Sequence, residues 1–373
     1  MMPEIWLKYG TTDLVLNIKY ENLLKHVSSD IPLLREDEIR SRLSNVSLTD
    51  DLLIFPLSDT KSAVKVIILL LEMVRAHGFT NVTIGVPPRM GGVLRNNLED
   101  KATLMNQINY QSFHNIIKKN QNILFISQTV YDPLFGYGGT PTILLRNYID
   151  NGMSAAFNAR QDNMPRPGVK GPPLKIALSN SENIPAKSIE LVSNSCGIAE
   201  FYYGSISEAS QNAIRHLDSV STIELESTNS AIISTGSEIG MHSTLSDSLN
   251  SLWNSIHIVR ENGSAILLSE NRDGLGRDAL QMYVEGRLKI EEQIKTSYIE
   301  GLEHLLYLQE LLQKGLCLGI VSTLPQYYLN KLGFKTYIGL KNVLENLLTR
   351  YGKNHKVLVL SDANIEFLKK KTV

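Results

Sequence analysis

The sequence predicts an α/β protein with two Rossmann-like domains, largely parallel sheets and a cleft between the domains. Three observations lead to this expectation. The chain has 373 residues, enough for two or three domains. Short apolar runs of strand character alternate along it with longer runs of helical periodicity. Where a helical run joins two such strands, the strands are expected to lie parallel in one sheet.

The first part of the chain predicts a hairpin followed by a βαβ unit. The apolar stretch 52–57 reads as a buried strand, and the helix after it ends at Gly78, in the position where glycine often terminates a helix. The elements in order are strands 5–9 and 14–18 around a turn at 10–13, strand 52–57, helix 62–77 and strand 82–86.

The same alternation continues to the C-terminus, interrupted by a Pro/Gly-rich loop at 163–173. Before residue 219 we expect strand 122–126, helix 142–158, strand 174–178, helix 189–195, strand 201–203 and helix 208–216. After it we expect strand 231–234, helix 245–261, strand 264–269, a helical region 278–314, strands 318–321, 336–338 and 357–360, and helix 343–351. The polar stretch 219–224 predicts the boundary, with domains 1–218 and 219–373.

The composition is that of a globular protein, because 43% of the residues are hydrophobic and 20% are charged. The 37 Lys and Arg residues nearly balance the 38 Asp and Glu residues, so the net charge of −1 gives no reason to expect nucleic acid or an anionic membrane as partner. Cys196 and Cys317 are too few and too far apart for a disulfide framework or a cysteine zinc site. A reducing, cytoplasmic setting fits.

Neither a membrane span nor export is expected. The most apolar run, from Val66 to Leu71, is much shorter than the ~20 residues that a spanning helix needs. The N-terminus has no basic segment followed by a hydrophobic one. The eight histidines show neither H-x-x-H nor H-E-x-x-H spacing, so we predict no metal site from them.

Ligands of parallel sheets bind beyond the carboxyl ends of the strands, and four loops occupy such positions. They are residues 58–62, 87–92, 132–142 and 270–277. In the first loop, Asp59 or Thr60 caps the following helix, or the helix N-terminus together with Lys61 binds an anion. In the second, Arg89 pairs with a carboxylate or is a solvated surface residue.

The third loop is glycine-rich, so it allows a ligand to approach the backbone or simply forms a tight turn. Thr140 and Pro141 are predicted as the N-cap and first residue of the next helix. We expect this loop and residues 58–62 to face one another across a shared cleft. The charged, glycine-rich fourth loop lines the cleft or forms a capping turn. No dinucleotide fingerprint, P-loop or nucleophile elbow occurs in the sequence.

Short motifs follow one another along the chain in a particular order. They are Leu7-Lys8-Tyr9-Gly10 before Leu14-Val15-Leu16, Ser58-Asp59-Thr60-Lys61-Ser62, Gly136-Tyr137-Gly138-Gly139-Thr140-Pro141-Thr142, Ser234-Thr235-Gly236, Asn262-Gly263-Ser264-Ala265-Ile266-Leu267-Leu268, and Asp273-Gly274-Leu275-Gly276. In this order the chain resembles the nickel-pincer lactate racemase (LarA) family over nearly its whole length. The second motif stands where the family has Asp-x-Thr-Arg-Pro, and the third is similar to its Gly-Phe-Ser-Gly-Gly-x-Lys.

The resemblance implies a two-domain α/β enzyme that racemises a 2-hydroxy acid. The family's cofactor is a nickel-bearing pyridinium pincer, attached to a lysine and ligated by a histidine, which accepts the C2 hydride. Two histidines act as acid and base, and an arginine holds the substrate carboxylate. Here the cofactor lysine falls on Thr142, the histidine before the glycine loop on Asp132, the Gly-x-His region on residues 87–90, and the arginine on Lys61.

These departures shape the functional expectation. We expect no covalent pincer cofactor, and the sequence leaves open which cofactor, if any, is bound. The leading hypothesis is a LarA-like protein that binds a small 2-hydroxy acid or related anionic metabolite, as a racemase or epimerase with altered chemistry; the alternative is a non-catalytic ligand- or partner-binding paralogue. An active nickel racemase is a third hypothesis, which requires these loops to align with the family's motifs several residues away from the positions given above. An oligomer is compatible with any of these hypotheses.

The candidate residues follow from the same loops. The catalytic candidates are Asp59, Lys61 and Asp132. The substrate- or anion-binding candidates are Thr60, Arg89, Gly138, Gly139, Thr140 and Thr142.

Overall fold

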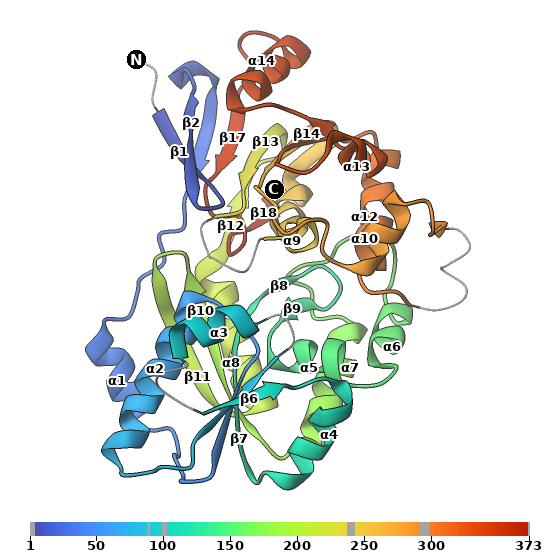
Figure 1. The fold of residues 1–373 in the computed structure, drawn as a ribbon. Helices are drawn as coiled ribbons and strands as arrows, with labels where there is room; N and C mark the ends of the chain where they lie inside the picture. Colours follow the sequence, from blue (N-terminus) through green and yellow to red (C-terminus); the bar gives the residue numbers. More distant parts are fainter. Residues whose placement is uncertain (1–3, 88–89, 99–102, 237–242, 291–297, 372–373) are drawn as a thin grey trace.

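The computed structural model describes residues 4–87, 90–98, 103–236, 243–290 and 298–371. It contains two six-stranded sheets, which lie one above the other in Figure 1. The first sheet is parallel except for β11, which runs antiparallel to β10. Its order is β11 (Gly197–Ser205), β10 (Lys187–Asn194), β7 (Asn122–Gln128), β4 (Leu52–Pro56), β5 (Thr83–Val86) and β6 (Thr103–Gln107).

The second six-stranded sheet is parallel throughout. Its order is β16 (Lys335–Thr336), β15 (Cys317–Val321), β14 (Val259–Leu268), β13 (Thr228–Ser234), β17 (Val357–Leu360) and β3 (Leu23–Val27). The central strands are buried on both faces, which is why they read as continuous apolar runs in the sequence. The predicted α/β class with largely parallel sheets is confirmed.

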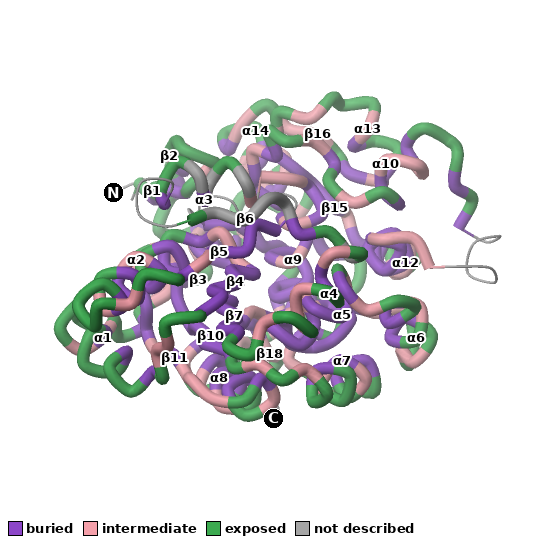
Figure 2. The backbone as a smooth tube through the Cα atoms, turned by 60° about the horizontal axis from the view of Figure 1, so that its bottom comes forward, coloured by how far each residue is buried: buried purple, intermediate pink, exposed green. Residues whose placement is uncertain are grey.

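Helices cover both faces of the first sheet. One face buries Ile54, Leu124 and Ile189 against α1, α2 and α3, and the other buries Phe55 and Phe125 against α4, α5 and α8. Figure 2 shows the strands as a buried interior between more exposed helices. These helices are α1 (Glu36–Leu43), α2 (Lys61–Ala76), α3 (Gly91–Leu98), α4 (Tyr110–Lys119), α5 (Thr140–Tyr148) and α8 (Ile206–Ser221), with α6 (Gly152–Asn158) and α7 (Pro172–Glu182) beside them.

The second sheet is covered differently on its two faces. One face buries Ile233 and Leu267 under α9 (Leu245–Ser255), α10 (Asp278–Val284), α12 (Leu302–Gln313) and α13 (Gln326–Lys331). The other buries Ile232 and Ile266 under α14 (Leu340–Tyr351) and the hairpin of β1 (Glu4–Tyr9) and β2 (Thr12–Asn17).

The N-terminal segment packs with the second sheet, not the first. The hairpin lies on that sheet, and β3 pairs in parallel with β17 at its edge. In addition, β12 (Thr222–Leu225) pairs with β18 (Phe367–Lys370) in a separate two-stranded sheet. The division into domains 1–218 and 219–373 stays a prediction, and the strand pairing adds that residues 4–27 share a core with the second half of the chain.

Several expected elements differ in type or extent. Residues 174–178, expected as a strand, lie in helix α7, and residues 189–195, expected as a helix, lie mostly in strand β10. Both are short apolar runs, for which periodicity alone does not separate strand from helix. The expected helix 142–158 is two helices with a break at Asn151, whose φ is 54°. The region 278–314 contains α10 and α12 as separate helices, and the helix expected over 245–261 ends at Ser255, before β14.

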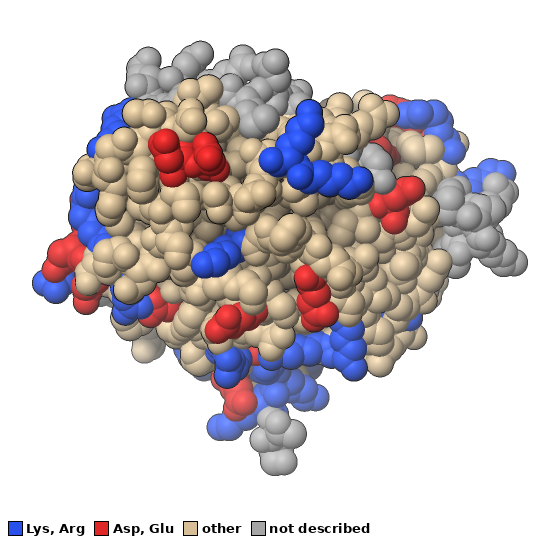
Figure 3. All heavy atoms as spheres, turned by 90° about the horizontal axis from the view of Figure 1, so that it is seen from below, with Lys and Arg blue, Asp and Glu red and all other residues tan. Residues whose placement is uncertain are grey.

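The surface agrees with a near-neutral chain. On the face drawn in Figure 3, Lys and Arg side chains are interspersed with Asp and Glu side chains over a largely uncharged surface. In the described part of the chain, no helix has the length and apolar character that a membrane crossing requires.

Candidate functional site

The carboxyl ends of the two large sheets meet. Ser195 follows β10 of the first sheet, and its Oγ donates a hydrogen bond of 2.8 Å to Oδ2 of Asp362, which follows β17 of the second. Nearby, Nδ2 of Asn194 donates to Oγ of Ser29, just after β3, at 3.2 Å. This junction is the position at which parallel α/β sheets bind ligands.

Buried polar atoms without a hydrogen-bond partner gather at this junction. A buried polar group without a partner costs about 1–3 kcal/mol, so a concentration of them in one place requires a reason. In the part of the chain that the structure describes, the buried side chains concerned are Gln128, Ser193, Asn254, Asp362, Asn364 and Glu366, which we call the inter-sheet cluster.

Hydrogen bonds to the backbone connect the members of the cluster within each sheet. On the first sheet, Nε2 of Gln128 donates to the carbonyl of Ser193 at 3.1 Å, which leaves the amide oxygen of Gln128 unpartnered. On the second, Nδ2 of Asn254 on α9 donates to the carbonyls of Ala363 and Asn364 at 3.2 and 3.0 Å. Atoms that could accept or donate to a ligand are therefore held in place by the backbone.

The two carboxyl groups of the cluster have strongly shifted pKa values. Burial, and then the charge of Asp362, raises the pKa of Glu366 from 4.5 to about 8. Burial raises the pKa of Asp362 from 3.8 to about 6, although the hydrogen bond from Ser195 opposes the shift. Near neutral pH the pair therefore contains one ionised and one protonated carboxyl group, which is the combination that acid–base chemistry uses.

A glycine allows the close approach at this point. Gly236 follows β13 with a φ of +86°, and a Cβ there would lie 2.2 Å from Oδ1 of Asp362. Any other residue would be strained by its backbone conformation and would push on that carboxylate.

The first predicted loop borders the junction. Oγ of Ser58 accepts a hydrogen bond of 2.9 Å from the backbone N–H of Gln128, so this loop lies beside the first-sheet part of the cluster. Asp59 is half-buried; burial, and more weakly the charge of Asp247 on α9, raises its pKa. Asp59 therefore faces the second half of the chain.

Thr60 and Lys61 begin helix α2. Thr60 is buried and caps the helix, its Oγ1 accepting from the N–H of Ala63 at 3.2 Å, which is one of the two roles predicted for this loop. Lys61 is exposed at the first helical position. An anion site at these residues stays a prediction.

Asp132 lies in a different environment. Its Oδ1 accepts from the N–H groups of Leu134 and Phe135, both at 2.8 Å, and its Oδ2 pairs with Arg146 on α5 at 3.2 Å. Arg146 also pairs with Glu303 on α12 at 3.0 Å. Within the described residues, no hydrogen bond or ion pair connects Asp132 with Asp59, and these contacts give Asp132 a role in holding the two halves together.

The ion pairs of Arg146 with Asp132 and Glu303 are largely buried. Burial opposes ionisation of Glu303, but the charges of Arg146, His304 and Arg277 prevail and lower its pKa to about 2. The Oε2 of Glu303 also accepts from the hydroxyl of Tyr298 at 3.0 Å. Sequence reasoning did not single out Arg146 or Glu303, because their roles depend on a contact between residues 157 positions apart.

The glycine-rich loop is a hairpin that leads into a helix. Strands β8 (Val130–Asp132) and β9 (Gly136–Gly138) pair, Gly139 is the N-cap, and α5 begins at Thr140. The cap predicted at Thr140 is therefore wrong by one residue, because the hydroxyl of Thr142 and the backbone of Gly139 bond reciprocally at 3.0 Å and close the first turn there.

A carboxylate of the protein itself occupies the N-terminus of α5. Glu190 on β10 is buried and accepts from the N–H of Thr140 at 3.1 Å, from Oγ of Ser127 at 2.7 Å and from Oγ1 of Thr129 at 3.1 Å. A Cβ at Gly139 would lie 2.8 Å from Oε2 of Glu190, so the glycine permits this contact. Ligand binding by Gly138, Gly139, Thr140 and Thr142 stays a prediction, and Thr140 and Thr142 already have partners.

Arg89 lies outside the described residues. In the described ranges, no group of three or more His, Cys, Asp or Glu side chains is placed to hold a metal ion. The cluster residues on the second sheet were missed in the sequence, although a signal existed: Asp362 follows the expected strand 357–360, so the rule that selected the four loops also applies to it.

The fold of this chain is similar to that of a lactate racemase apoprotein. That structure, from Thermoanaerobacterium thermosaccharolyticum, matches with a TM-score of 0.78 at 13% sequence identity, over 99% of this chain and 100% of that one. A Thermotoga maritima protein matches with a TM-score of 0.64 at 10% identity, over 91% of this chain and 99% of that one. No model of a protein family matches the sequence, and no curated protein matches it. The similarity shows a lactate racemase-like fold.

That no nickel pincer is covalently attached stays a prediction, based on the residue that the sequence resemblance puts at the attachment position. The LarA resemblance places the attachment at Thr142, which has a hydroxyl where the link needs an amine, and that hydroxyl closes the first turn of α5. We therefore derive no chemical step through that cofactor.

Proposed function

We propose that this lactate racemase-like protein binds a small 2-hydroxy acid at the inter-sheet cluster and acts as a racemase- or epimerase-type isomerase. The observation that supports this most is the pair formed by Asp362 and Glu366, which are buried, lack full hydrogen bonding in the described structure, and have pKa values on either side of neutrality. One of the unpartnered amide oxygens of Gln128, Asn254 and Asn364 would accept the single hydrogen bond that the substrate hydroxyl donates.

The proposed reaction exchanges a proton at C2. The carboxylate of Asp362 removes the C2 proton, the electron pair of that C–H bond moves into the substrate carboxyl group, and the carboxylic acid of Glu366 returns a proton to C2. Atoms and electrons balance without an added oxidant or reductant. The opposite pKa positions of the two groups suit one for the base and the other for the acid.

The test is isotope exchange. Single enantiomers of short 2-hydroxy acids are incubated with the protein in D₂O, and C2 deuterium and enantiomeric composition are followed by NMR and chiral chromatography. We expect deuterium in the product, and a loss of at least about 100-fold in rate for Asp362→Asn and for Glu366→Gln. Glu21→Gln, an exposed control carboxylate, should keep the rate. Inversion without deuterium uptake, or variants as active as wild type, would exclude this mechanism.

The alternative is a non-catalytic binding protein. It is favoured because Thr140 and Thr142, two of the predicted binding residues, already form hydrogen bonds within the protein. In that case small 2-hydroxy acids raise the melting temperature of the protein without any exchange at C2. The exposed ammonium of Lys61 is the candidate contact for the substrate carboxylate. If it makes that contact, the stabilisation by such anions shrinks in Lys61→Ala; equal stabilisation of both proteins removes Lys61 from the site.

A further inference from the structure

A surface pocket of about 480 Å³ lies along strand β18, and none of its lining residues belongs to the inter-sheet cluster. Its walls come from the loop 159–171, from β12, from η2 (Ile256–Ile258) and from β18 itself. Lys369 and Lys370 are adjacent on β18 and so point to opposite faces, yet both line the pocket.

The charge of the pocket is mainly positive. Arg166, Lys369 and Lys370 line it, against the single carboxylate of Glu224. The Nζ of Lys369 lies 5.3 Å from the ring centre of Phe367, and the ammonium group of neither lysine has a hydrogen bond or ion pair with a described residue. Arg166 is already paired with Asp162, so Lys369 and Lys370 are the cations whose mutual repulsion a bound anion would offset.

The pocket also has an apolar floor. Val169, which is 45% exposed, and the partly buried Met164 provide its accessible surface, whereas Phe367 is only 4% exposed and lies beneath them. Gly168 lets the loop lie against that ring, because a Cβ there would be 2.6 Å from Cε1 of Phe367. The floor offers an apolar or flat group a surface to pack on, while the cations lie beside it.

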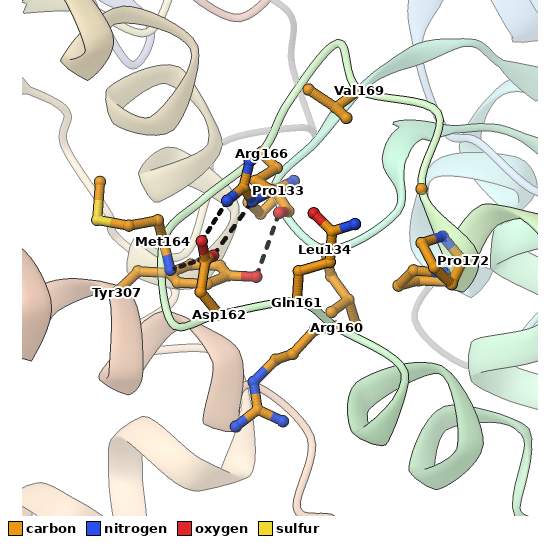
Figure 4. Close-up of a pocket in the computed structure, with 12 residues that line it drawn as sticks. Pro133, Leu134, Arg160, Gln161, Asp162, Met164, Arg166, Val169, Pro172 and Tyr307 are labelled. Atoms are coloured by element: carbon orange, nitrogen blue, oxygen red, sulfur yellow. Dashed lines mark hydrogen bonds and ion pairs between the residues drawn. The ribbon is translucent and has the colours of Figure 1, made fainter.

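The loop wall is fixed in place before any ligand binds. The N–H of Arg166 donates to the carbonyl of Pro133, and the N–H of Gly168 to that of Gly136, both at 2.9 Å. Figure 4 shows the carboxylate of Asp162 pointing at the guanidinium of Arg166, so this arginine is oriented by its own loop. The hollow on that side of the loop has about 30 Å³, room for one or two waters, so a ligand would take the larger pocket on the other side.

We propose that this pocket binds a small phosphate monoester that carries a flat or apolar group, as a nucleoside monophosphate does. The phosphate dianion is placed between the two lysines and Arg166, and the base packs against Met164 and Val169. A pocket of this volume is in the usual range for small ligands, roughly 300–1,000 Å³. The pocket would be a second ligand site, separate from the inter-sheet cluster.

The test uses AMP as the probe, with adenosine and inorganic phosphate as the two half-ligands, in calorimetric titrations. We expect AMP to bind at least about tenfold more tightly than either half, and to weaken as salt rises from ~50 to ~300 mM. Lys369→Ala and Lys370→Ala should each weaken AMP binding about tenfold, the loss of one charge-assisted contact. Lys341→Ala, which removes an ammonium that is 89% exposed on α14, is the matched control and should bind as wild type does.

Three results would overturn the proposal: no AMP binding, adenosine binding as tightly as AMP, or an equal loss in Lys341→Ala. Melting temperatures of the lysine variants show that the fold is intact. Asp362→Asn should keep its AMP affinity, so a failure of the isomerase proposal and a failure of this one give different results.

Discussion

Two groups of buried carboxylates in this molecule differ in whether they have partners. Asp132, Glu190 and Glu303 each accept two or more hydrogen bonds or ion pairs from named groups. Asp362 has one unpartnered oxygen and Glu366 has two. The first group is explained by the folded structure alone, whereas the unpartnered oxygens of the second cost stability without a hydrogen bond from the described chain. The difference separates residues that hold the fold from residues available to a ligand.

The two groups also occupy different places relative to the sheets. The ion pairs of Asp132, Arg146 and Glu303 connect α12 with α5 and the β8–β9 hairpin. Asp362 and Glu366 lie where the carboxyl ends of the sheets meet. The proposed ligand-binding position and the supporting interface are thus separate, although both lie between the same two halves.

The largest expected effect is on the partnered group. Arg146→Met leaves the carboxylate of Asp132 without its cation and that of Glu303 with only the more distant Arg277, 3.9 Å away, and we expect a loss of about 3–5 kcal/mol in the free energy of unfolding, measured with denaturant. The double variant Arg146→Met/Glu303→Gln should recover part of that loss because one uncompensated charge is gone. Arg40→Ala, which breaks only exposed pairs, is the control. A loss no larger than that of Arg40→Ala would break the comparison.

The next prediction sharpens the comparison through pH. Glu366 keeps its proton in the folded protein up to about pH 8 but ionises near 4.5 when unfolded, so stability falls as pH rises from about 5 to about 8. The Glu366→Gln variant cannot ionise, and its decline over this range should be shallower by up to ~1.4 kcal/mol per pH unit. Unfolding midpoints at a series of pH values measure this.

The contribution of Glu303 to stability changes with pH in the opposite direction and serves as an internal check. Its folded pKa of about 2 lies below the unfolded value of 4.5, so its contribution is present above pH 4.5 and is lost as pH falls towards 2.

Parallel pH profiles for wild type and Glu366→Gln between pH 5 and 8 would show that Glu366 is not buried as a neutral acid.

The sequence predicted the parts of this structure that depend on neighbouring residues. Strand β4, helix α2 and strand β5 were expected as a βαβ unit, and the two strands are parallel neighbours in the first sheet. Thr60 at the start of α2 and Gly78 after its end mark the limits of the helix by their local chemistry. The fold class followed from the repetition of such units.

What the sequence did not predict depends on distant contacts. Strand β10 was expected as a helix because its apolar run carries no local sign of the strands beside it, and Glu190 within it has meaning only through the helix N-terminus that it meets. Glu366 looks like an ordinary acidic residue in the sequence. Its burial next to Asp362 comes from the way the chain returns to pair β18 with β12.

A third prediction concerns Glu190, the partnered carboxylate at the N-terminus of α5. Glu190→Ala removes the acceptor of the Thr140 N–H and of the hydroxyls of Ser127 and Thr129, and we expect a loss of about 1–3 kcal/mol in unfolding free energy. Phosphate or acetate should then restore part of the melting temperature, because the helix N-terminus is left open to an anion. No anion effect in the variant would show that this end of α5 is closed for another reason.

The smallest effect compares two neighbours at the start of α2. Thr60→Ala removes the hydroxyl that accepts from the N–H of Ala63, and a lost N-cap costs typically ~1 kcal/mol. Lys61→Ala should leave stability unchanged or slightly higher, because an ammonium in the first turn opposes the helix dipole by ~0.3–1 kcal/mol at most. Denaturant midpoints without ligand measure both variants. If Lys61→Ala proves as destabilising as Thr60→Ala, the lysine has a structural role and does not belong with the groups left free for a ligand. If only Thr60→Ala is destabilised, Thr60 belongs with the partnered carboxylates among the residues that hold the fold, while Lys61 stays available to the substrate carboxylate.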